Sequence, residues 1–571
     1  MIVQGRGALR PCNKPTMPNR RFRPYHILWL TPLVFLAIFF FYPLLNILSV
    51  SLVQDGTLRL QGFAELLSGA HYRETLWFTL WQAALSTLLT LALALPGAYV
   101  FARYDFPGKR LLSSLSVLPF VLPTVVTALA FMALIGRRGL VNLALMGLFG
   151  LAEPPIDIEG TLAIILVVHV FYNYAVALRI ISGFWANQNP RMEEAARVLG
   201  CRGWRMWWEI RLPLLRPAIL AAAVLVFVFT FTSFGVVLLL GGRYTTLEVE
   251  IYRQAVSYFD LPVAAALSLV QIVLMFAMML VYTRLQQRLA LDLQSVKRVA
   301  QRPANAGQWA LVMANVVLMI VLLFAPLAAL VLRSVTIGSD GFTLSHYLHL
   351  NENQRGSVLF VPPAEAIYNS VAFAAATTLL SLLLGILTAY LLASRASRLL
   401  RWLDPLFMLP LATSAVTLGF GFIIALDEPP LNLRTSIVLI PLAHTLVAMP
   451  FVVRSVLPAL RAIPPSLGEA AQVLGAPPLT VWRLIDLPLI SRGILVGATF
   501  AFTVSMGEFG ASLFIARPDT PTIPVVIFRL LGQPGSTNYG QALAMSVILM
   551  LVCAVSFALI ERVRDAGAGE F

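Results

Sequence analysis

Twelve long apolar segments, separated by short polar stretches, dominate the chain. Each holds about 20 or more mostly apolar residues, enough for a helix to cross the hydrocarbon core of a bilayer. The runs are continuously apolar, whereas strands of a membrane barrel alternate apolar and polar residues over about ten positions. The pattern therefore predicts an all-α, polytopic membrane protein with about 12 transmembrane helices. The expected segments are 27–50, 76–102, 111–135, 160–183, 214–240, 263–284, 309–333, 367–393, 402–426, 433–457, 489–515 and 540–561.

The composition agrees with membrane insertion. Only 12% of the residues are charged and the mean hydropathy is +0.82, whereas about 25% of residues are charged in an ordinary soluble protein. The net charge of +14 would suggest nucleic acid as the partner of a soluble chain. Here the expected partner is the lipid bilayer, and no nucleic acid is expected. Cys12, Cys201 and Cys553 are too few and too scattered for a disulfide framework or a metal site.

The basic residues gather in alternate loops. Loops 103–110, 184–213 and 394–401 are rich in arginine or lysine, whereas a loop on the opposite side contains Glu153 and Asp157. Because Lys and Arg accumulate in cytoplasmic loops, the basic loops and both chain termini are expected in the cytoplasm. The even number of segments agrees with that orientation.

The same reasoning divides the chain into four parts. The basic N-terminus leads into the first apolar segment without a small-residue cleavage site, which predicts an uncleaved first span. A stretch with Pro303, Asn305 and Gly307 separates the two groups of six segments and is expected to be an irregular linker. The expected parts are a cytoplasmic N-terminus (1–26), a first module (27–285), a cytoplasmic linker (286–308) and a second module (309–562).

A polar signature in the first module recurs in the second at a constant offset. Its register is shared over roughly 65 residues, which indicates a duplication. We therefore expect two homologous six-helix halves. The first half has about 16 extra residues near 136–159, expected on the outer face, where they would change one side of an outer mouth. The pairs that lie 275 positions apart include Glu194 and Glu469, Gly200 and Gly475, Trp207 and Trp482, Pro213 and Pro488, and His169 and His444.

The first copy of the signature predicts a short, capped helix. Asn189 is a good N-cap, and Pro190 suits the first helical position, where a missing N–H costs little. Glu193 and Glu194 favour the positive N-terminal end of the helix dipole. Gly200 can adopt the left-handed conformation that ends a helix.

The second copy predicts a similar helix. Ser466 and Glu469 are spaced as a capping box, and Gly475 ends the helix. The small faces Ala195-Ala196 and Ala470-Ala471 allow close approach by another backbone. One such helix could simply rest on lipid. Two copies in fixed register, each followed by Leu-Pro before the next apolar segment, favour a docking role instead.

The pattern Glu-Ala-Ala, three residues, Gly, then Leu-Pro resembles the cytoplasmic loop of permease subunits of bacterial ATP-binding-cassette importers. The resemblance covers roughly 75–285 and 365–561. It implies a coupling helix in each half that sits in a cleft of an ATPase subunit. It also implies two such ATPase subunits, an extracytoplasmic solute-binding protein and the bacterial inner membrane. The resemblance assigns coupling to Glu193, Glu194, Ala195, Ala196, Gly200, Glu469, Ala470, Ala471 and Gly475.

Within that superfamily, fused two-module permeases are similar to thiamine and ferric-iron importers. Residues 78–83, 136–139, 169–173 and 233–238 look most like the thiamine type, so thiamine is the expected solute. Residues 505–511 are also similar to molybdate- and sulfate-type permeases, which leaves ferric iron or an oxyanion as alternatives. The chain itself is then no enzyme and binds no cofactor, because its partner subunits use the ATP.

Glu508 is the most informative single residue, because a carboxylate deep in an apolar segment costs several kcal/mol. It could partner a cationic solute in the substrate path, or it could be a structural carboxylate capped by backbone amides near Gly507 and Gly510. Both interpretations remain open. The equivalent residue in the first half is Ser233, so any charge at this level of the path is one-sided.

The remaining candidates are weaker. His169 and His444 have no acidic or Cys partner at helical spacing, so packing or hydrogen bonding is favoured over metal binding. The chain has no Walker A loop, so a partner must supply the ATP chemistry. A proton-coupled secondary transporter is the main alternative, since it also has twelve spans in two related halves, but it normally needs several intramembrane carboxylates. A membrane enzyme would need a cluster of nucleophile, base and metal ligands, which the sequence lacks.

Overall fold

The computed structural model describes residues 30–565, apart from residues 55–56, 59–60, 292–299, 337–340, 353–360, 394–405, 428 and 430. The expected basic N-terminus at 1–26 and the basic loop at 394–401 lie outside the described residues. The described part is built of helices, with one small hairpin in which β1 (Val53–Gln54) pairs antiparallel with β2 (Thr57–Leu58) and Val53 lies opposite Leu58.

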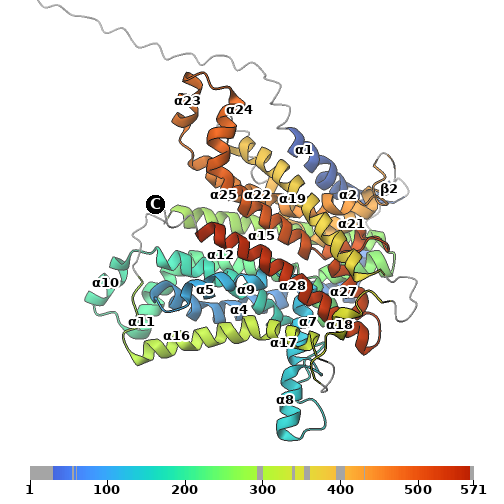
Figure 1. Ribbon diagram of the computed structural model, residues 1–571, viewed down its shortest axis with the longest axis horizontal. Helices are drawn as coiled ribbons and strands as arrows, with labels where there is room; N and C mark the ends of the chain where they lie inside the picture. The colour runs from blue at the N-terminus through green and yellow to red at the C-terminus, as the bar shows by residue number, and fades with distance from the viewer. Residues whose placement is uncertain are drawn as a thin grey trace, which may run out of the picture.

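The helices form two bundles that lie one above the other in Figure 1. Eleven helical segments among the described residues are long and apolar enough to cross a bilayer, which confirms the all-α, polytopic class. The first half contains α1 (Thr31–Leu36), η3 (Ala37–Phe41), α2 (Tyr42–Leu52), α3 (Gln61–Ser68), α4 (Ala70–Arg103), α5 (Lys109–Leu115), α6 (Leu118–Val121), α7 (Thr124–Ile135), α8 (Leu140–Phe149), α9 (Leu162–Ala186), α10 (Pro190–Val198), α11 (Gly203–Met206), η4 (Trp207–Arg211), α12 (Leu212–Phe231), α13 (Gly235–Leu240), α14 (Leu247–Tyr252), η5 (Arg253–Ser257) and α15 (Leu261–Leu291). The second half contains α16 (Ala306–Met319), η6 (Ile320–Phe324), α17 (Ala325–Ser334), α18 (Ser345–Leu348), α19 (Pro363–Ala393), η7 (Leu409–Ala412), α21 (Ala415–Ala425), α22 (Leu439–Ala462), α23 (Pro465–Val473), α24 (Pro478–Val481), η8 (Trp482–Asp486), α25 (Leu487–Gly507), α26 (Gly510–Ile515), α27 (Ile523–Leu531) and α28 (Ser536–Asp565).

The expectation of a continuous helix is wrong for the third segment of each half. The segment at 111–135 is broken into α5, α6 and α7, and the described part of 402–426 is broken between η7 and α21. Pro123 explains the first break: it has no N–H to donate and disfavours helical backbone at Leu122, which is extended with ψ 141°. The ninth segment is correspondingly short, because α21 has only 11 residues.

The fifth segments are interrupted as well. In the first half α12 ends at Phe231 and α13 begins at Gly235, and in the second half α25 ends at Gly507 and α26 begins at Gly510. Breaks at membrane depth are tolerated where the freed backbone is buried in protein or lines a cavity. A cavity is therefore expected beside the four breaks.

Four π-helical turns each end two residues before a proline. Such a turn adds one residue to the helical repeat and relieves the clash between a proline ring and the carbonyl four residues before it. Two of the four occupy equivalent places in the first spans, so the duplication also includes those spans, which the sequence signature did not reach. The π turns and their prolines are η3 with Pro43, η4 with Pro213, η6 with Pro326 and η8 with Pro488.

The two halves interlock through their first spans. Within each half, the second, fourth and fifth spans pack together as α4, α9 and α12 or as α19, α22 and α25. The first span of each half, however, packs against the third segment of the other half: α2 lies against α21, and α17 lies against α7. Each half thus supplies one helix to the core of its partner.

The 16-residue insertion forms a projecting hairpin. Helix α8 runs roughly perpendicular to the long helices and points away from the bundle (Figure 1). Asn142 is buried at its base and donates to the carbonyls of Gly136 and Ile156 at 2.8 and 2.7 Å. Arg137 donates to both carboxylate oxygens of Asp157. The insertion thus projects from the bundle and is held at its base, and its place at an outer mouth stays a prediction.

Candidate functional site

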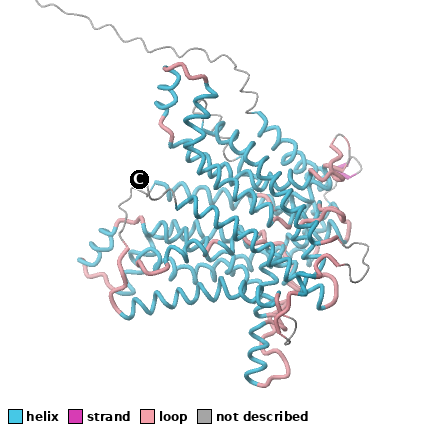
Figure 2. Tube along the Cα trace, in the orientation of Figure 1, coloured by secondary structure: helices cyan, strands magenta, loops and turns pink. Residues whose placement is uncertain are grey.

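The two signature helices, α10 and α23, project from the same end of the bundle (Figure 1), and both appear as short helices in Figure 2. Each has nine residues. The predicted stops are confirmed: Gly200 and Gly475 both have φ +85°. The N–H of Cys201 donates to the carbonyl of Ala196 and that of Gly200 to the carbonyl of Arg197, which is a Schellman motif. The second helix repeats both bonds.

The N-termini of the two helices differ. The Oδ1 of Asn189 accepts from the N–H of Arg191 at 3.0 Å, which confirms the predicted cap of α10. The capping box predicted for the second copy is wrong, because α23 begins at Pro465, with Pro464 at the N-cap and Ser466 already inside the helix. A proline at the first helical position fixes φ and needs no acceptor, so tandem prolines place the start of the helix without a side-chain cap.

Glu193 lies beneath α10 and not on its free face. It is 4% exposed, and its Oε2 lies 3.1 Å from Arg103 Nη1 and 3.4 Å from Arg211 Nη2. The guanidinium of Arg197 is 3.8 Å away. Because Arg103 ends α4 and Arg211 ends η4, Glu193 ties the signature helix to two membrane helices. Glu194, the next residue, is exposed.

The second copy has no such anchor. Gly468 occupies the position of Glu193, and Asp486 occupies that of Arg211. The carboxylate of Asp486 instead accepts a hydrogen bond from the Tyr390 hydroxyl at 3.2 Å. The two signature helices therefore present similar free faces but are fastened to their halves by different chemistry.

Those free faces carry an exposed apolar pair at the same place in both copies. Val198 and Leu199 at the end of α10 are 88% and 86% exposed, and Val473 and Leu474 at the end of α23 are both 87% exposed. Large apolar side chains that protrude this far beside charged residues are typical of an interaction site. The small residues Ala195 and Ala470 are also exposed, whereas their neighbours Ala196 and Ala471 are buried and half-buried.

A cavity of about 390 Å³ lies where the helix breaks meet. All four breaks contribute to its wall, so it is bounded by both halves, as expected for backbone that is irregular at membrane depth. Two carboxylates, Glu248 and Glu508, and the hydroxyl of Ser233 belong to the lining. The aromatic lining residues are Phe120, Tyr172, Phe229, Phe234, Phe451, Phe500 and Phe509.

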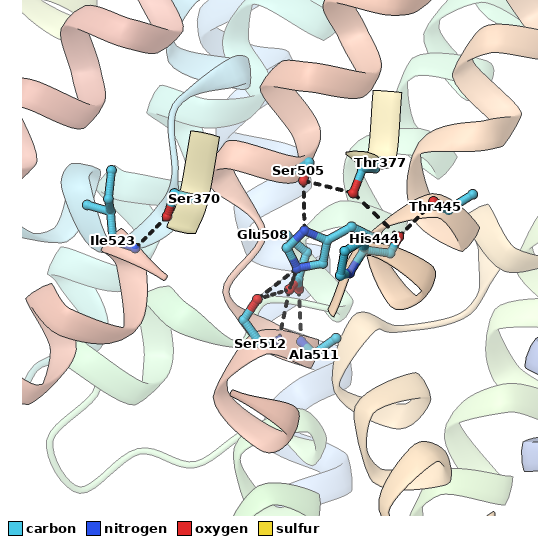
Figure 3. A network of polar contacts seen from close by, with 10 residues as sticks. Ser370, Thr377, His444, Thr445, Ser505, Glu508, Ala511, Ser512 and Ile523 are labelled. Atoms are coloured by element: carbon cyan, nitrogen blue, oxygen red, sulfur yellow. Dashed lines mark hydrogen bonds and ion pairs between the residues drawn. The ribbon is translucent and has the colours of Figure 1, made fainter. Parts of the chain in front are cut away.

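Glu508 is held by the start of α26 (Figure 3). Its Oε1 accepts from the N–H of Ala511 at 2.8 Å, and its Oε2 accepts from the N–H and the hydroxyl of Ser512 at 2.9 and 2.8 Å. The Nε2 of His444 lies 3.3 Å from Oε2, and its Nδ1 lies 2.8 Å from the hydroxyl of Ser505. This geometry meets the requirements of the structural interpretation. A role of Glu508 toward substrate stays a prediction.

The first half repeats the arrangement without the acid. His169 Nε2 lies 2.8 Å from Ser233 Oγ, and its Nδ1 lies 3.0 Å from Ser86 Oγ. His169 and His444 are both at most 2% exposed, and each joins two helices of its own half through hydroxyl groups. The contacts agree with the hydrogen-bonding role that the sequence favoured.

Comparison with known proteins identifies the family of this chain. Residues 94–291 and 381–565, more than half of the chain, match the model of the binding-protein-dependent transport system inner membrane component. The chain belongs to this family. It is thus a permease, the translocation subunit of a binding-protein-dependent transport system, and its two matched regions correspond to the two halves of the fold.

The permease matches its relatives over most of their length. It is 29% identical over 506 residues to the thiamine transport system permease protein ThiP of Salmonella typhimurium, covering 85% of this chain and 88% of that protein. It is 28% identical to the protein of the same name from Brucella abortus, covering 87% and 89%. A probable ABC transporter permease protein from Sinorhizobium fredii is 25% identical, covering 91% and 93%.

Sequence reasoning missed Glu248 in the permease. The residue lies between two apolar segments, in a stretch that reads as an outer loop, yet α14 folds back and buries Leu247–Ile251. The N–H of Leu247 donates to Thr79 Oγ1 at 3.0 Å, and the equivalent N–H of Ile523 donates to Ser370 Oγ at 2.8 Å. A signal was present: two glutamates alternate with Leu247, Val249 and Ile251 in a stretch too apolar for a free loop.

Proposed function

We propose that this permease carries thiamine across the bacterial inner membrane in an importer driven by two ATPase subunits, and that an extracytoplasmic binding protein delivers the solute. The observation that carries the proposal is the pair of nine-residue helices at one end of the bundle, which share a Schellman C-terminus and an exposed Val-Leu pair. Two matched docking elements fit two matched subunits. In this arrangement α10 and α23 face the cytoplasm, as do both termini.

Each coupling helix is connected to the cavity by one long helix. The chain continues from α10 through η4 into α12, which ends at Phe231 beside Ser233, and from α23 through η8 into α25, which ends beside Glu508. Helices are stiff rods that rise about 1.5 Å per residue. Closure of the ATPases would thus move both cavity walls through α12 and α25 and switch the side from which the solute has access.

The cavity supports thiamine over the alternatives. Thiamine combines flat rings with a positive charge, and this lining offers seven aromatic side chains and two carboxylates. Aromatic faces attract cations, and a carboxylate supplies a counter-charge. An oxyanion such as molybdate or sulfate would be repelled by both carboxylates. Ferric ion is a cation as well but gains little from aromatic walls.

Reconstitution tests the proposal directly. The permease would be copurified with its ATPase subunits, placed in proteoliposomes with its binding protein outside, and offered labelled thiamine, ferric ion and molybdate in separate assays. We expect ATP-dependent uptake of thiamine alone. Uptake of another solute would overturn the substrate. Uptake driven by a proton gradient without ATP or copurified ATPase would favour a secondary transporter and overturn the mechanism.

A further inference from the structure

Glu248 occupies the contact between the two halves at the central cavity. It is 1% exposed and belongs to α14 of the first half. Its Oε2 accepts from the hydroxyl of Ser414 at 2.6 Å, a residue of the second half, and its Oε1 accepts from the side-chain amide of Gln271. Gln271 in turn accepts from the hydroxyl of Thr417, also in the second half, at 3.4 Å.

The partners of Glu248 are all neutral. Among the described residues four glutamates are buried, and the other three lie within 4 Å of an arginine or a histidine: Glu193 of three arginines, Glu250 of His71 and Glu508 of His444. No Lys, Arg or His of the described part forms an ion pair with Glu248. A carboxylate at membrane depth is costly unless a cation or several donors face it, and it is a functional candidate for that reason.

The duplication shows that only the first half has a carboxylate at this position. The matched hydrogen bonds of Leu247 and Ile523 align Glu248 with Pro524, which has no side-chain charge. A carboxylate needed to build the re-entrant helix would be expected in both copies. The second copy forms its helix, α27, without one.

We propose that Glu248 is the counter-charge for a cationic solute in the central cavity. The role of Glu248 rests on the proposed import of thiamine, and it identifies the residue that recognises the positive charge of thiamine. An arriving cation would compete with the Ser414 hydroxyl and the Gln271 amide for the carboxylate oxygens. Solute binding would therefore weaken the hydrogen bonds that join the halves, so occupancy of the cavity and separation of its walls are linked.

The test compares two solutes that differ in charge, thiamine and an analogue in which a neutral thiophene ring replaces the thiazolium. Uptake is measured in the reconstituted importer with an excess of binding protein loaded with each solute, so that the rate reports translocation. We expect Glu248→Gln to lower thiamine uptake roughly 10- to 100-fold, the scale of a lost charge-assisted bond, and to leave uptake of the analogue unchanged. Glu248→Asp should retain much of the thiamine rate.

Two further variants separate charge from structure. Ser414→Ala removes the direct hydrogen bond between Glu248 and the second half but keeps the carboxylate, so this variant should still prefer thiamine over the analogue. Glu352→Gln, at an exposed site that does not line the cavity, is the matched control and should change neither rate. The proposal is overturned if Glu248→Gln slows both solutes equally, changes neither, or fails to assemble while Glu248→Asp behaves in the same way. If the wild-type importer takes up no thiamine, the proposed substrate is wrong. Uptake of an anion instead would also overturn the role of Glu248. Uptake of ferric ion that is lost in Glu248→Gln would support the role of Glu248 as a counter-charge.

Discussion

Charge at single residues decides how α10, the first signature helix, is held. The carboxylate of Glu193, which the resemblance assigns to coupling, is shared by three arginines from three elements. Its burial assigns it a positioning role, and Glu194 beside it is the acid that a partner can reach. Two adjacent residues of one motif thus differ in exposure: Glu193 makes internal contacts, and only Glu194 is available for the proposed docking.

We expect Glu193→Gln to loosen α10. Removing one member of a buried ion pair leaves the others uncompensated and typically costs about 3–5 kcal/mol. The variant should therefore have a clearly lower apparent Tm in a thermal-shift assay and should hydrolyse ATP with little uptake. The matched control is Glu209→Gln, which breaks only a solvent-exposed pair with Arg205, four residues before it on the helix. Equal Tm values for the two variants would show that Glu193 is not an anchor.

The free faces of the coupling helices are tested by charge reversal. Glu194→Lys combined with Glu469→Lys places cations at exposed sites near two helix N-termini, where the dipole disfavours them. We expect normal membrane insertion but loss of solute-stimulated ATPase activity and of uptake. The same reversal at the exposed Glu352 should have no effect. Uptake at the wild-type rate in the double variant would contradict the coupling assignment.

At the scale of elements, irregular pieces carry the functional features. Helix breaks line the cavity, π turns precede four prolines, and the base of the α8 hairpin is held by the hydrogen bonds of Asn142 and by the ion pair of Arg137 with Asp157. Hydrogen bonds from Arg137 lower the pKa of the Asp157 carboxyl. A group with a depressed pKa contributes stability above its unfolded value and loses it as pH falls through the folded value. The base of the hairpin should therefore be firm at neutral pH and loosen only in acid.

Hydrogen exchange would measure this loosening. Protection of the Ile156 N–H, which donates to Asn142 Oδ1 at 2.9 Å, should be constant near neutrality and fall once the pH drops below the ordinary carboxyl range of about 4. Asp157→Asn removes the titrating group and should give low protection at every pH. A loss of protection centred near pH 6 to 7 would point to a different group.

The sequence predicted the elements better than their interruptions. Hydropathy located the apolar segments because a run of about 20 apolar residues dominates the mean hydropathy of a window. The same averaging hides a single residue such as Pro123, which breaks the helix after the extended Leu122. Gly200 and Gly475 marked helix ends because their conformation is local. The cap at Ser466 failed because adjacent prolines decide the start of α23. Glu248 was missed because its burial depends on α14 folding back; the apolar residues around it indicate burial, but not that this short helix returns to the cavity.

At the scale of the whole molecule, the proposed orientation fixes which surface each loop faces. Cysteine labelling tests it in a background without Cys12, Cys201 and Cys553. A cysteine at the exposed Ala304, between the halves, should react with an impermeant reagent only from the cytoplasm, and one at the exposed Ala152, after α8, only from outside. The reverse pattern would place α10 and α23 outside and remove the basis for ATPase docking.

The exchange of first spans has a consequence for how the protein is made. Helix α7 enters the membrane early in synthesis, but its neighbour α17 belongs to the second half and is translated only after α15 and the connection that follows it. During that interval the surface of α7 that α17 later contacts faces lipid or the insertion machinery. The first half can therefore complete its packing only after α17 has been translated. If the two halves were synthesised as separate chains, each would lack the first-span helix that packs against its third segment in the intact protein.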